Sequence, residues 1–346
     1  MVGNYIELTE EEKLLLDELC SQSNTTENLD IKRQLIYGAV ELIRNHNDRL
    51  DLKLAAAAIN EMSKAFAMFA PYKEIRKVTI FGSARIAPET LLYERTKELA
   101  HIFAQEGWMV VTGAGPGIMA AGSEGAGANM AIGVNIRLPF ENQPNSWVSA
   151  GQKLVEMKYF FTRKLMLLKE SSGFLVLPGG FGTLDECFEL LTLVQTGKAE
   201  PAPIVLVEAD QSPYWRIWED FVNLQVYDHG LADRDDASLY FITDDIHEAK
   251  EEVIHFYSNY HSRRFINNTL IIRLQKAPNE QRCNELSEQF IDITGGTKIK
   301  KTPPSKIEIH DNDHLSLERI SFQFDKLHQG RLRELINALN TEPLDF

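Results

Sequence analysis

The chain has 346 residues, of which 44% are hydrophobic and 25% are charged. This balance is typical of a folded globular protein and excludes an intrinsically disordered chain. The formal net charge of −14 argues against nonspecific nucleic-acid binding, because such binding needs many cationic contacts to phosphate groups. The negative net charge is compatible with a small anionic ligand that is bound in a local pocket.

The cysteines and the first residues indicate a cytoplasmic protein. Cys20, Cys187 and Cys283 lie far apart and include no C-x-x-C pair, so they predict neither a disulfide framework nor a metal cluster. The acidic first residues lack the apolar core of a signal peptide. The most apolar early stretch, 52–70, is interrupted by Lys, Asn and Glu, so we expect no membrane span there.

Residues 1–73 predict a helical N-terminal extension without a catalytic cluster. Thr9 and Glu12 have the spacing of a capping box, and apolar residues follow them at helical intervals. Further helical runs cover about 30–46 and 52–69.

Residues 74–260 predict an α/β domain. Short, nearly continuous apolar strands alternate with helix-length amphipathic runs, which indicates a parallel sheet with helices on both faces. We therefore expect a Rossmann-like, doubly wound fold that binds its ligand at the carboxyl ends of the strands. The expected strands are 77–82, 108–113, 131–138, 173–178, 203–208 and 239–243.

Residues 265–346 predict a small α+β module, for which a ferredoxin-like arrangement is one candidate. A polar, Pro-containing segment at 301–315 joins its parts, and 263–265 is interpreted as a linker to the α/β domain. The expected elements are strands at 268–275 and 316–324 and helices at 279–292 and 326–339.

Small residues follow three of the strands expected in the α/β domain. Amides exposed at such turns, with no Cβ in the way, bind phosphate well where a helix begins. A tight strand-to-helix connection is the alternative for one such turn, but two at neighbouring strand ends favour a phosphate-bearing ligand. Ile118 stands at the third glycine of the dinucleotide fingerprint, and no Walker A motif occurs. The candidate binding residues are Gly82, Ser83, Gly113, Gly115, Gly117, Gly179, Gly180, Gly182 and Thr183.

Three charged residues near these turns are candidates for chemistry, and each has a structural alternative. Thr183 and Glu186 fit a capping box, in which Glu186 only ties down its own helix. Arg163 and Lys164 stand at the start of a nearly apolar helix. One interpretation is that both side chains form the solvated end of this helix. The other is that Arg163 faces the glycine turns and binds an anion through two hydrogen bonds. The nine histidines are scattered, so we expect no metal site.

The segment from Pro178 to Glu186, PGGFGTLDE, resembles the P-G-G-x-G-T-x-x-E signature of the LOG ("lonely guy") family of nucleotide 5′-monophosphate phosphoribohydrolases. The turn at 82–84, the TGAGPGIM segment at 112–119 and the Arg-Lys pair at 163–164 agree with the family in order and spacing. The resemblance covers about 74–260. Some relatives carry the label "lysine decarboxylase", but no pyridoxal-lysine context supports that activity here.

The resemblance implies a usually dimeric enzyme that hydrolyses the N-glycosidic bond of nucleoside 5′-monophosphates to a free base and ribose 5-phosphate. By position, Arg163 and Glu186 match the catalytic pair, and Lys164 and the two glycine turns match substrate-binding parts. No metal or organic cofactor is required. A carboxylate at Glu186 stabilises an oxocarbenium-like transition state and activates water, and the helix N-terminus is expected to keep it ionised.

Two departures from the family pattern bear on the substrate. Ala114 stands where many members have glycine, and 157–162 replaces the short plant-like sequence before Arg163. AMP-like purine nucleotides are the expected substrates, with cytokinin riboside monophosphates as the less favoured class. The alternatives are a non-catalytic nucleotide or cofactor carrier, and a regulator whose C-terminal module senses a metabolite. We expect a homo-oligomer that binds neither nucleic acid nor membrane.

Overall fold

The computed structural model describes residues 9–21, 28–46, 48–137, 144–149, 152–209 and 212–341. The chain divides into two compact units, Met1–Ser63 and Lys64–Phe346. None of the helices in these described ranges has the length and apolarity that a membrane crossing needs.

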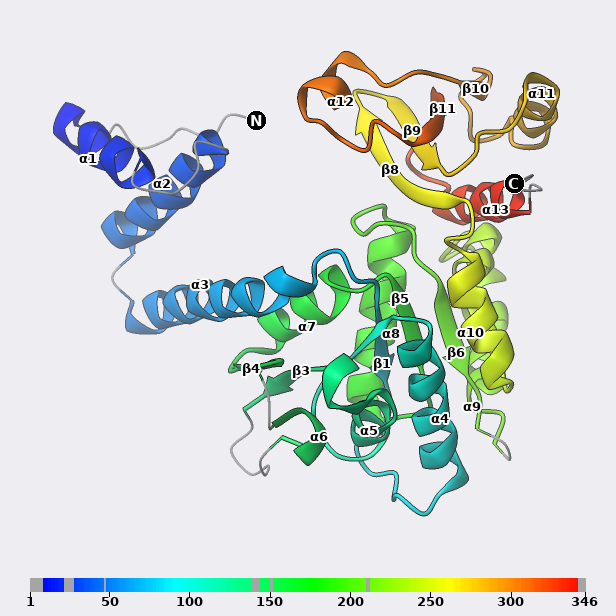
Figure 1. The fold of residues 1–346 in the computed structure, drawn as a ribbon, viewed down its shortest axis with the longest axis horizontal. Helices are drawn as coiled ribbons and strands as arrows, with labels where there is room; N and C mark the ends of the chain where they lie inside the picture. Colours follow the sequence, from blue (N-terminus) through cyan, green and yellow to red (C-terminus); the bar gives the residue numbers. More distant parts are fainter. Residues whose placement is uncertain are drawn as a thin grey trace. The chain divides into compact units, whose positions relative to one another are not determined.

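The first unit is helical, as the sequence predicts (Figure 1). Its helices are α1 (Glu10–Ser21), α2 (Leu29–Asn45) and the larger part of α3 (Arg49–Phe69). The predicted capping box is present, because the Thr9 amide donates to Glu12 Oε2 at 2.9 Å and the Glu12 amide donates to Thr9 Oγ1 at 3.3 Å.

The second unit contains a seven-stranded, fully parallel sheet in the order β4-β3-β2-β1-β5-β6-β7. The predicted Rossmann-like fold is confirmed. Its one unpredicted strand is β4, a short edge strand whose Glu156 is exposed, so it lacks the continuous apolar run that marks the others. The strands are β1 (Lys77–Phe81), β2 (Met109–Thr112), β3 (Ala131–Ile136), β4 (Leu154–Met157), β5 (Gly173–Val176), β6 (Ile204–Val207) and β7 (Phe241–Thr243).

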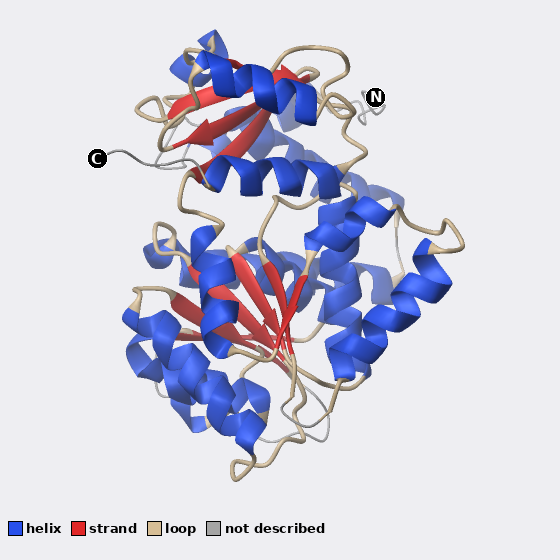
Figure 2. Ribbon diagram, turned by 90° about the vertical axis from the view of Figure 1, so that its right-hand side faces the viewer, coloured by secondary structure: helices blue, strands red, loops and turns tan. Residues whose placement is uncertain are grey.

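Helices cover both faces of this sheet (Figure 2). One face carries the main core, in which α4, α5 and α10 pack on β1, β2, β5 and β6. On the other face the Thr79 hydroxyl of β1 donates to Leu167 O of α7 at 2.9 Å. The helices of the domain are α4 (Leu91–Gln105), α5 (Ile118–Met130), α6 (Ser146–Ser149), α7 (Phe160–Lys169), α8 (Phe181–Gln195), α9 (Tyr214–Phe221) and α10 (Ile246–His255), with short turns at η1 (Ala70–Tyr72), η2 (Val222–Tyr227) and η3 (Arg234–Leu239).

The strand order fixes where a ligand is expected. From β1 the chain winds outward to β4 and then returns to place β5 on the other side of β1. Between the carboxyl ends of β1 and β5 the winding direction reverses, and doubly wound sheets bind ligands at such switch points. The two turns that follow these strands meet there, since the Ser83 amide donates to Pro178 O at 3.2 Å.

The C-terminal module is an antiparallel sheet in the order β10-β11-β9-β8, with α11 and α13 packed on one face. The α+β expectation is confirmed. The chain order runs β-β-α-β-α-β-α and so differs from the β-α-β-β-α-β order of ferredoxin-like folds. Its elements are β8 (Tyr260–Ile266), β9 (Thr269–Leu274), α11 (Glu280–Gln289), β10 (Lys300–Lys301), α12 (Lys306–His310), β11 (Glu318–Gln323) and α13 (Gln329–Asn340).

Two sequence interpretations fail in this module. Residues 263–265 are the middle of strand β8 and not a linker. The strand was missed because its arginines look like exposed residues in the sequence. Arg263 is nevertheless buried, since its guanidinium donates to Glu200, Ala199 O and Gln329, which are all remote in sequence. The polar segment 301–315 contains α12, which begins with a capping box between Ser305 and Glu308.

Candidate active site

A groove of about 750 Å³ lies at the switch point, lined by the turns after β1, β2 and β5 and by the first turns of α7 and α8. The structure brings together there most of the residues predicted from sequence. They are Gly82, Ser83, Gly113, Arg163, Lys164, Gly179, Gly180, Gly182, Thr183 and Glu186. Gly115 and Gly117 line a neighbouring cavity of about 560 Å³, which shares Ala84 and Arg85 with the groove.

Backbone hydrogen bonds lock the turns after β1 and β2 together. The Ile118 amide donates to Ser83 O at 3.0 Å. Gly117 has a φ of +65°, and a Cβ there would lie 2.3 Å from Ser83 O. Only glycine fits both the left-handed backbone and the close approach. Gly117 therefore contributes to the groove by allowing the turns after β1 and β2 to pack closely together.

The turn after β5 leaves its backbone open to the groove. No atom lies within 4 Å of the place where a Cβ would stand on Gly180 or Gly182, so neighbouring atoms do not require glycine there. Gly180 is the N-cap of α8 and offers no side chain to satisfy the first amides of the helix. The Tyr214 hydroxyl fixes the turn by donating to Gly179 O at 2.7 Å. Unsatisfied amides at a helix start form a natural anion site.

Arg163 and Glu186 form a nearly buried pair in the groove. Arg163 Nη1 lies 3.3 Å from Glu186 Oε1, with 9% of the Arg163 side chain and 13% of the Glu186 side chain exposed. Arg163 Nε donates to Val134 O of β3 at 3.0 Å, which fixes the guanidinium. A Cβ on Gly113 would stand 1.9 Å from Arg163 Nη2, so glycine makes room for this group. The solvated-helix-end alternative for Arg163 is wrong.

Two expectations for Glu186 are corrected. The N-cap of α8 is Gly180 and not Thr183, so no capping box forms, and Glu186 lies beyond the first helical turn. The helix dipole acts mainly within that turn. Burial instead raises the pKa of Glu186 to about 7, against the opposing attraction of Arg163 and Lys164. At neutral pH this carboxyl group therefore exchanges readily between its protonated and ionised forms.

Lys164 ties α7 to α8 along the wall of the groove. Its Nζ lies 2.5 Å from Asp185 Oδ2 and 2.8 Å from Glu189 Oε2. Burial alone lowers the pKa of Lys164, but the hydrogen bonds to these two carboxylates outweigh it and raise the value. The substrate-binding role of Lys164 stays a prediction. The contacts of Lys164 in the structure are ion pairs that hold helix α7 against helix α8.

Sequence reasoning missed Arg85 as a site residue. Arg85 follows the turn after β1, at the switch point of the sheet. This position after a strand end is the sequence signal by which Arg85 could have been found. Its exposed side chain makes no hydrogen bond or ion pair with any part of the chain that the structure describes. Phe160 and Phe181, which are 52% and 93% exposed, line the mouth of the groove.

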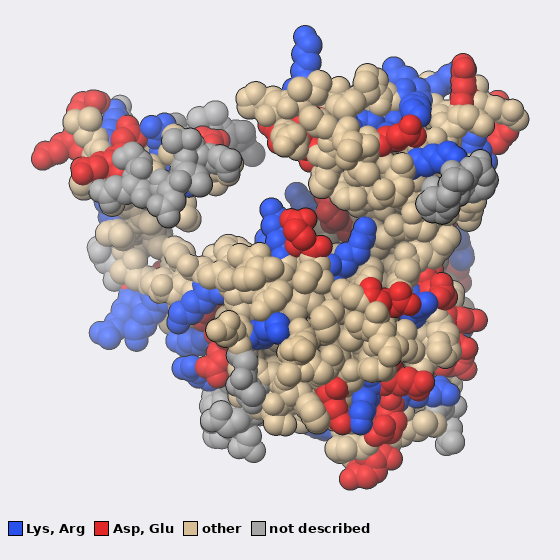
Figure 3. Space-filling view, in the orientation of Figure 1, with Lys and Arg blue, Asp and Glu red and all other residues tan. Residues whose placement is uncertain are grey.

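The arrangement offers phosphate binding beside a carboxyl group poised for proton transfer. Backbone amides, a buried guanidinium and Glu186 converge from the turns after β1, β2 and β5 and from helices α7 and α8. Within the described ranges, no three His, Cys, Asp or Glu side chains are grouped so as to hold a metal ion. Acidic and basic side chains are interspersed on the face in Figure 3 rather than gathered into one broad basic surface.

Comparisons with known proteins agree with the motifs. Residues 115–253 match the family described as "Possible lysine decarboxylase". The cytokinin riboside 5′-monophosphate phosphoribohydrolase of Mycobacterium tuberculosis is 29% identical over 146 residues, which span 41% of this chain and 72% of that protein.

Two solved structures resemble the chain over about half its length. The molybdenum cofactor binding protein of Rippkaea orientalis is 20% identical with a TM-score of 0.36, covering 51% of this chain and 94% of that one. The molybdenum cofactor carrier protein of Chlamydomonas reinhardtii is 19% identical with a TM-score of 0.37, covering 52% and 97%. The fold assignment therefore rests on the strand order of this chain. The family model and the phosphoribohydrolase of Mycobacterium tuberculosis support the resemblance of the α/β domain to the LOG family.

Proposed function

We propose that the groove hydrolyses the N-glycosidic bond of nucleoside 5′-monophosphates, releasing a free base and ribose 5-phosphate. The observation that carries the proposal is the buried Arg163–Glu186 pair, which stands between glycine turns at the switch point of the sheet. The phosphoribohydrolase named among the relatives of this chain supports the same reaction class.

The 5′-phosphate is assigned to the turn from Gly179 to Thr183. This turn presents the first amides of α8, with open space beside Gly180 and Gly182 for close approach of an anion. Binding a remote phosphate positions the sugar for reaction, because that binding energy fixes the rest of the nucleotide. Glu186 lies one helical turn further along the same helix, near the position expected for C1′.

Glu186 is assigned to the reacting centre. In its ionised form the carboxylate stabilises positive charge on the ribosyl ring and accepts a proton from the attacking water. A pKa near 7 suits this role, since a base works best when its pKa lies near the working pH. Because only the ionised form is active, base release should fall as the pH drops below about 7. Arg163 holds Glu186 in place and opposes the rise of its pKa.

AMP-like purine nucleotides are the proposed substrates, and cytokinin riboside monophosphates are the related class to be compared. We place the protein in the cytoplasm, an assignment supported by three cysteines that lie far apart in the sequence and include no C-x-x-C pair. No metal or organic cofactor enters the proposed reaction.

The test is base release from AMP, GMP, IMP, CMP, UMP and N6-isopentenyl AMP by the wild type and by Glu186→Gln. Glutamine keeps the size of the side chain but cannot accept the proton. We expect base release to fall by about 100-fold or more while nucleotide binding persists. Glu98→Gln, which changes an exposed carboxylate on α4 outside the groove lining, serves as the matched control. Tight nucleotide binding without base release from any substrate would support the carrier alternative instead.

A further inference from the structure

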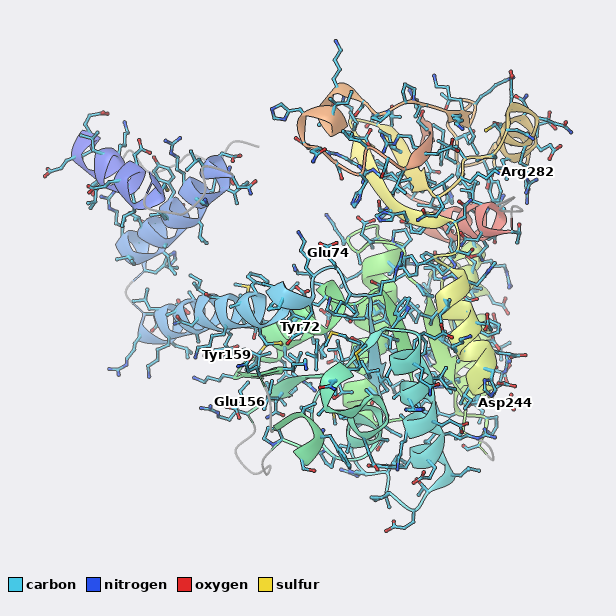
Figure 4. All side chains as sticks on the ribbon, viewed as in Figure 1. Tyr72, Glu74, Glu156, Tyr159, Asp244 and Arg282 are labelled. Atoms are coloured by element: carbon cyan, nitrogen blue, oxygen red, sulfur yellow. The ribbon has the colours of Figure 1, made fainter. Side chains whose placement is uncertain are left out.

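A second cavity lies wholly within the C-terminal module and shares no lining residue with the groove. It has a volume of about 680 Å³, within the usual range for small-molecule pockets. Its walls are the segment 276–280, one side of α11 at Cys283 and Asn284, and the segment 298–301, which ends in β10. Arg282, which is labelled in Figure 4, lies beside Cys283 near the start of α11. It pairs with Glu285, and neither residue lines the cavity.

The lining is strongly basic in an acidic protein. Lys276, Lys298, Lys300 and Lys301 face one acidic residue, Glu280, in this lining, whereas the whole chain has a formal charge of −14. Concave surfaces lined by one sign of charge concentrate the field and attract ligands of opposite sign. Lys298 Nζ lies 3.4 Å from the neutral Asn284 Oδ1, whereas Lys301 Nζ pairs with Glu318 Oε1 at 2.6 Å. Lys298 and Lys300 are both exposed at the cavity.

The floor of the cavity is apolar and preformed. Ala277, Cys283 and Ile299 are buried there, between 2% and 7% exposed. The Ile299 amide donates to Ser287 Oγ at 2.9 Å, which joins the segment just before β10 to α11. The Ala277 amide donates to Glu318 Oε2 at 2.7 Å, which joins the opposite wall to β11. A ligand that fits both features carries negative charge at one end and an apolar part at the other.

We propose that this cavity binds a small phosphorylated organic molecule. Its phosphate groups contact Lys298 and Lys300, with Lys276 and Lys301 at the edges, and its apolar part rests on Cys283 and Ile299. Ammonium groups bind phosphate as point charges through charge-assisted hydrogen bonds. The four lysines surround one concavity of small-molecule size, whereas an extended nucleic acid is bound by a basic stripe along a surface.

A lysine-reactivity footprint on the full chain locates the site directly. The protein is acetylated with acetic anhydride in the presence and absence of pyrophosphate or ATP, and the modified lysines are identified by mass spectrometry. We expect Lys298 and Lys300 to become several-fold less reactive with either probe, while Lys306 on α12 reacts unchanged. Probe bound in the groove leaves Lys298 and Lys300 unaffected, so the two sites are distinguished without reference to the proposed function.

Calorimetric titration of the double variant Lys298→Gln/Lys300→Gln measures the contribution of the pair. We expect the affinity for pyrophosphate at this site to fall by about tenfold or more, since two charge-assisted contacts are lost. The control Lys306→Gln/Lys326→Gln removes the same charge from the module outside the cavity and should bind as the wild type does. Equal affinity of the two variants, or protection by neither probe, would overturn the proposal. Protection by a single-stranded oligonucleotide alone would also overturn it, in favour of nucleic-acid binding.

Discussion

At the residue scale, the environment of a side chain decides its chemistry more than its type does. Glu186 shows this most clearly. Its position on a helix suggested an ionised carboxylate, but only 13% of the side chain is exposed, and burial raises its pKa to about 7. The nearby charges of Arg163 and Lys164 reduce this rise without cancelling it. The same burial that costs stability gives the carboxyl group a pKa suited to proton transfer near neutral pH.

The raised pKa of Glu186 predicts how stability depends on pH. Between about 4.5 and 7 the folded protein binds a proton that the unfolded chain has released, so this contribution is present at low pH and is lost as the pH rises. Relative to Glu186→Gln, the wild type should lose up to about 3 kcal/mol of unfolding free energy across this range. Urea unfolding of both proteins at several pH values measures the difference. A difference that stays constant with pH would contradict the raised pKa.

Arg85 provides a second prediction at this scale. Because its guanidinium projects at the edge shared by the groove and the neighbouring cavity, we expect it to contact the anionic substrate. Arg85→Ala should lower kcat/KM by about 10- to 100-fold, mainly through KM, and Arg85→Lys should recover part of the loss. Arg137→Ala, which removes an exposed arginine paired with Glu156, is the control. Steady-state kinetics of base release would show no difference between the variants if Arg85 were only a surface residue.

At the element scale, hydrogen bonds and close approaches between turns build the groove. The turns after β1, β2 and β5 are joined through Ser83, whose amide donates to Pro178 O and whose carbonyl accepts from the Ile118 amide. Helix α8 supplies both the open amides and Glu186, and Lys164 ties it to α7 through Asp185 and Glu189. A change that separates these turns should disturb every binding group together.

Gly117 tests this arrangement, with Gly127 as a matched control. Both have positive φ, but a Cβ on Gly117 meets Ser83 O at 2.3 Å, whereas a Cβ on Gly127 meets no atom within 4 Å. Gly127→Ala should cost about 1 to 3 kcal/mol of unfolding free energy through backbone strain alone, because its φ of 72° and ψ of 162° suit almost no residue but glycine. Gly117→Ala should cost about 3 kcal/mol or more, because the turn must also move. Chemical unfolding compares the two variants, and equal costs would show that the close approach does not matter.

At the scale of the whole molecule, helices α7 and α8 of the α/β domain expose several large apolar side chains. The exposed residues are Phe160, Phe161, Leu165, Phe181 and Phe188. Exposed apolar surface is typical of protein interfaces when it is contiguous. Two copies of the chain are the expected partners, in line with the dimers usual in the family that the motifs resemble.

Light scattering of the purified protein should therefore give about twice the chain mass of 39.3 kDa. Phe161→Glu/Leu165→Glu should dissociate the dimer, because two charges would be buried in an apolar interface. Leu231→Glu, which alters an exposed leucine elsewhere in the domain, should leave the mass unchanged. A wild type that runs as a monomer would refute the expectation.

The sequence by itself determined the parallel α/β fold, the positions of its main strands along the chain and most of the residues that meet at the switch point. Apolar strands and glycine turns leave periodic, local signals, and parallel strands bring their carboxyl ends to one edge. Tertiary structure alone decided three other features: the short edge strand β4, the charged strand β8 and the protonation of Glu186. Each depends on segments remote in sequence, such as Glu200 as the partner of Arg263, or the surrounding elements that bury Glu186 and raise its pKa. The local sequence pattern does not predict such partners, because burial and charge pairing arise only when segments distant in sequence pack together.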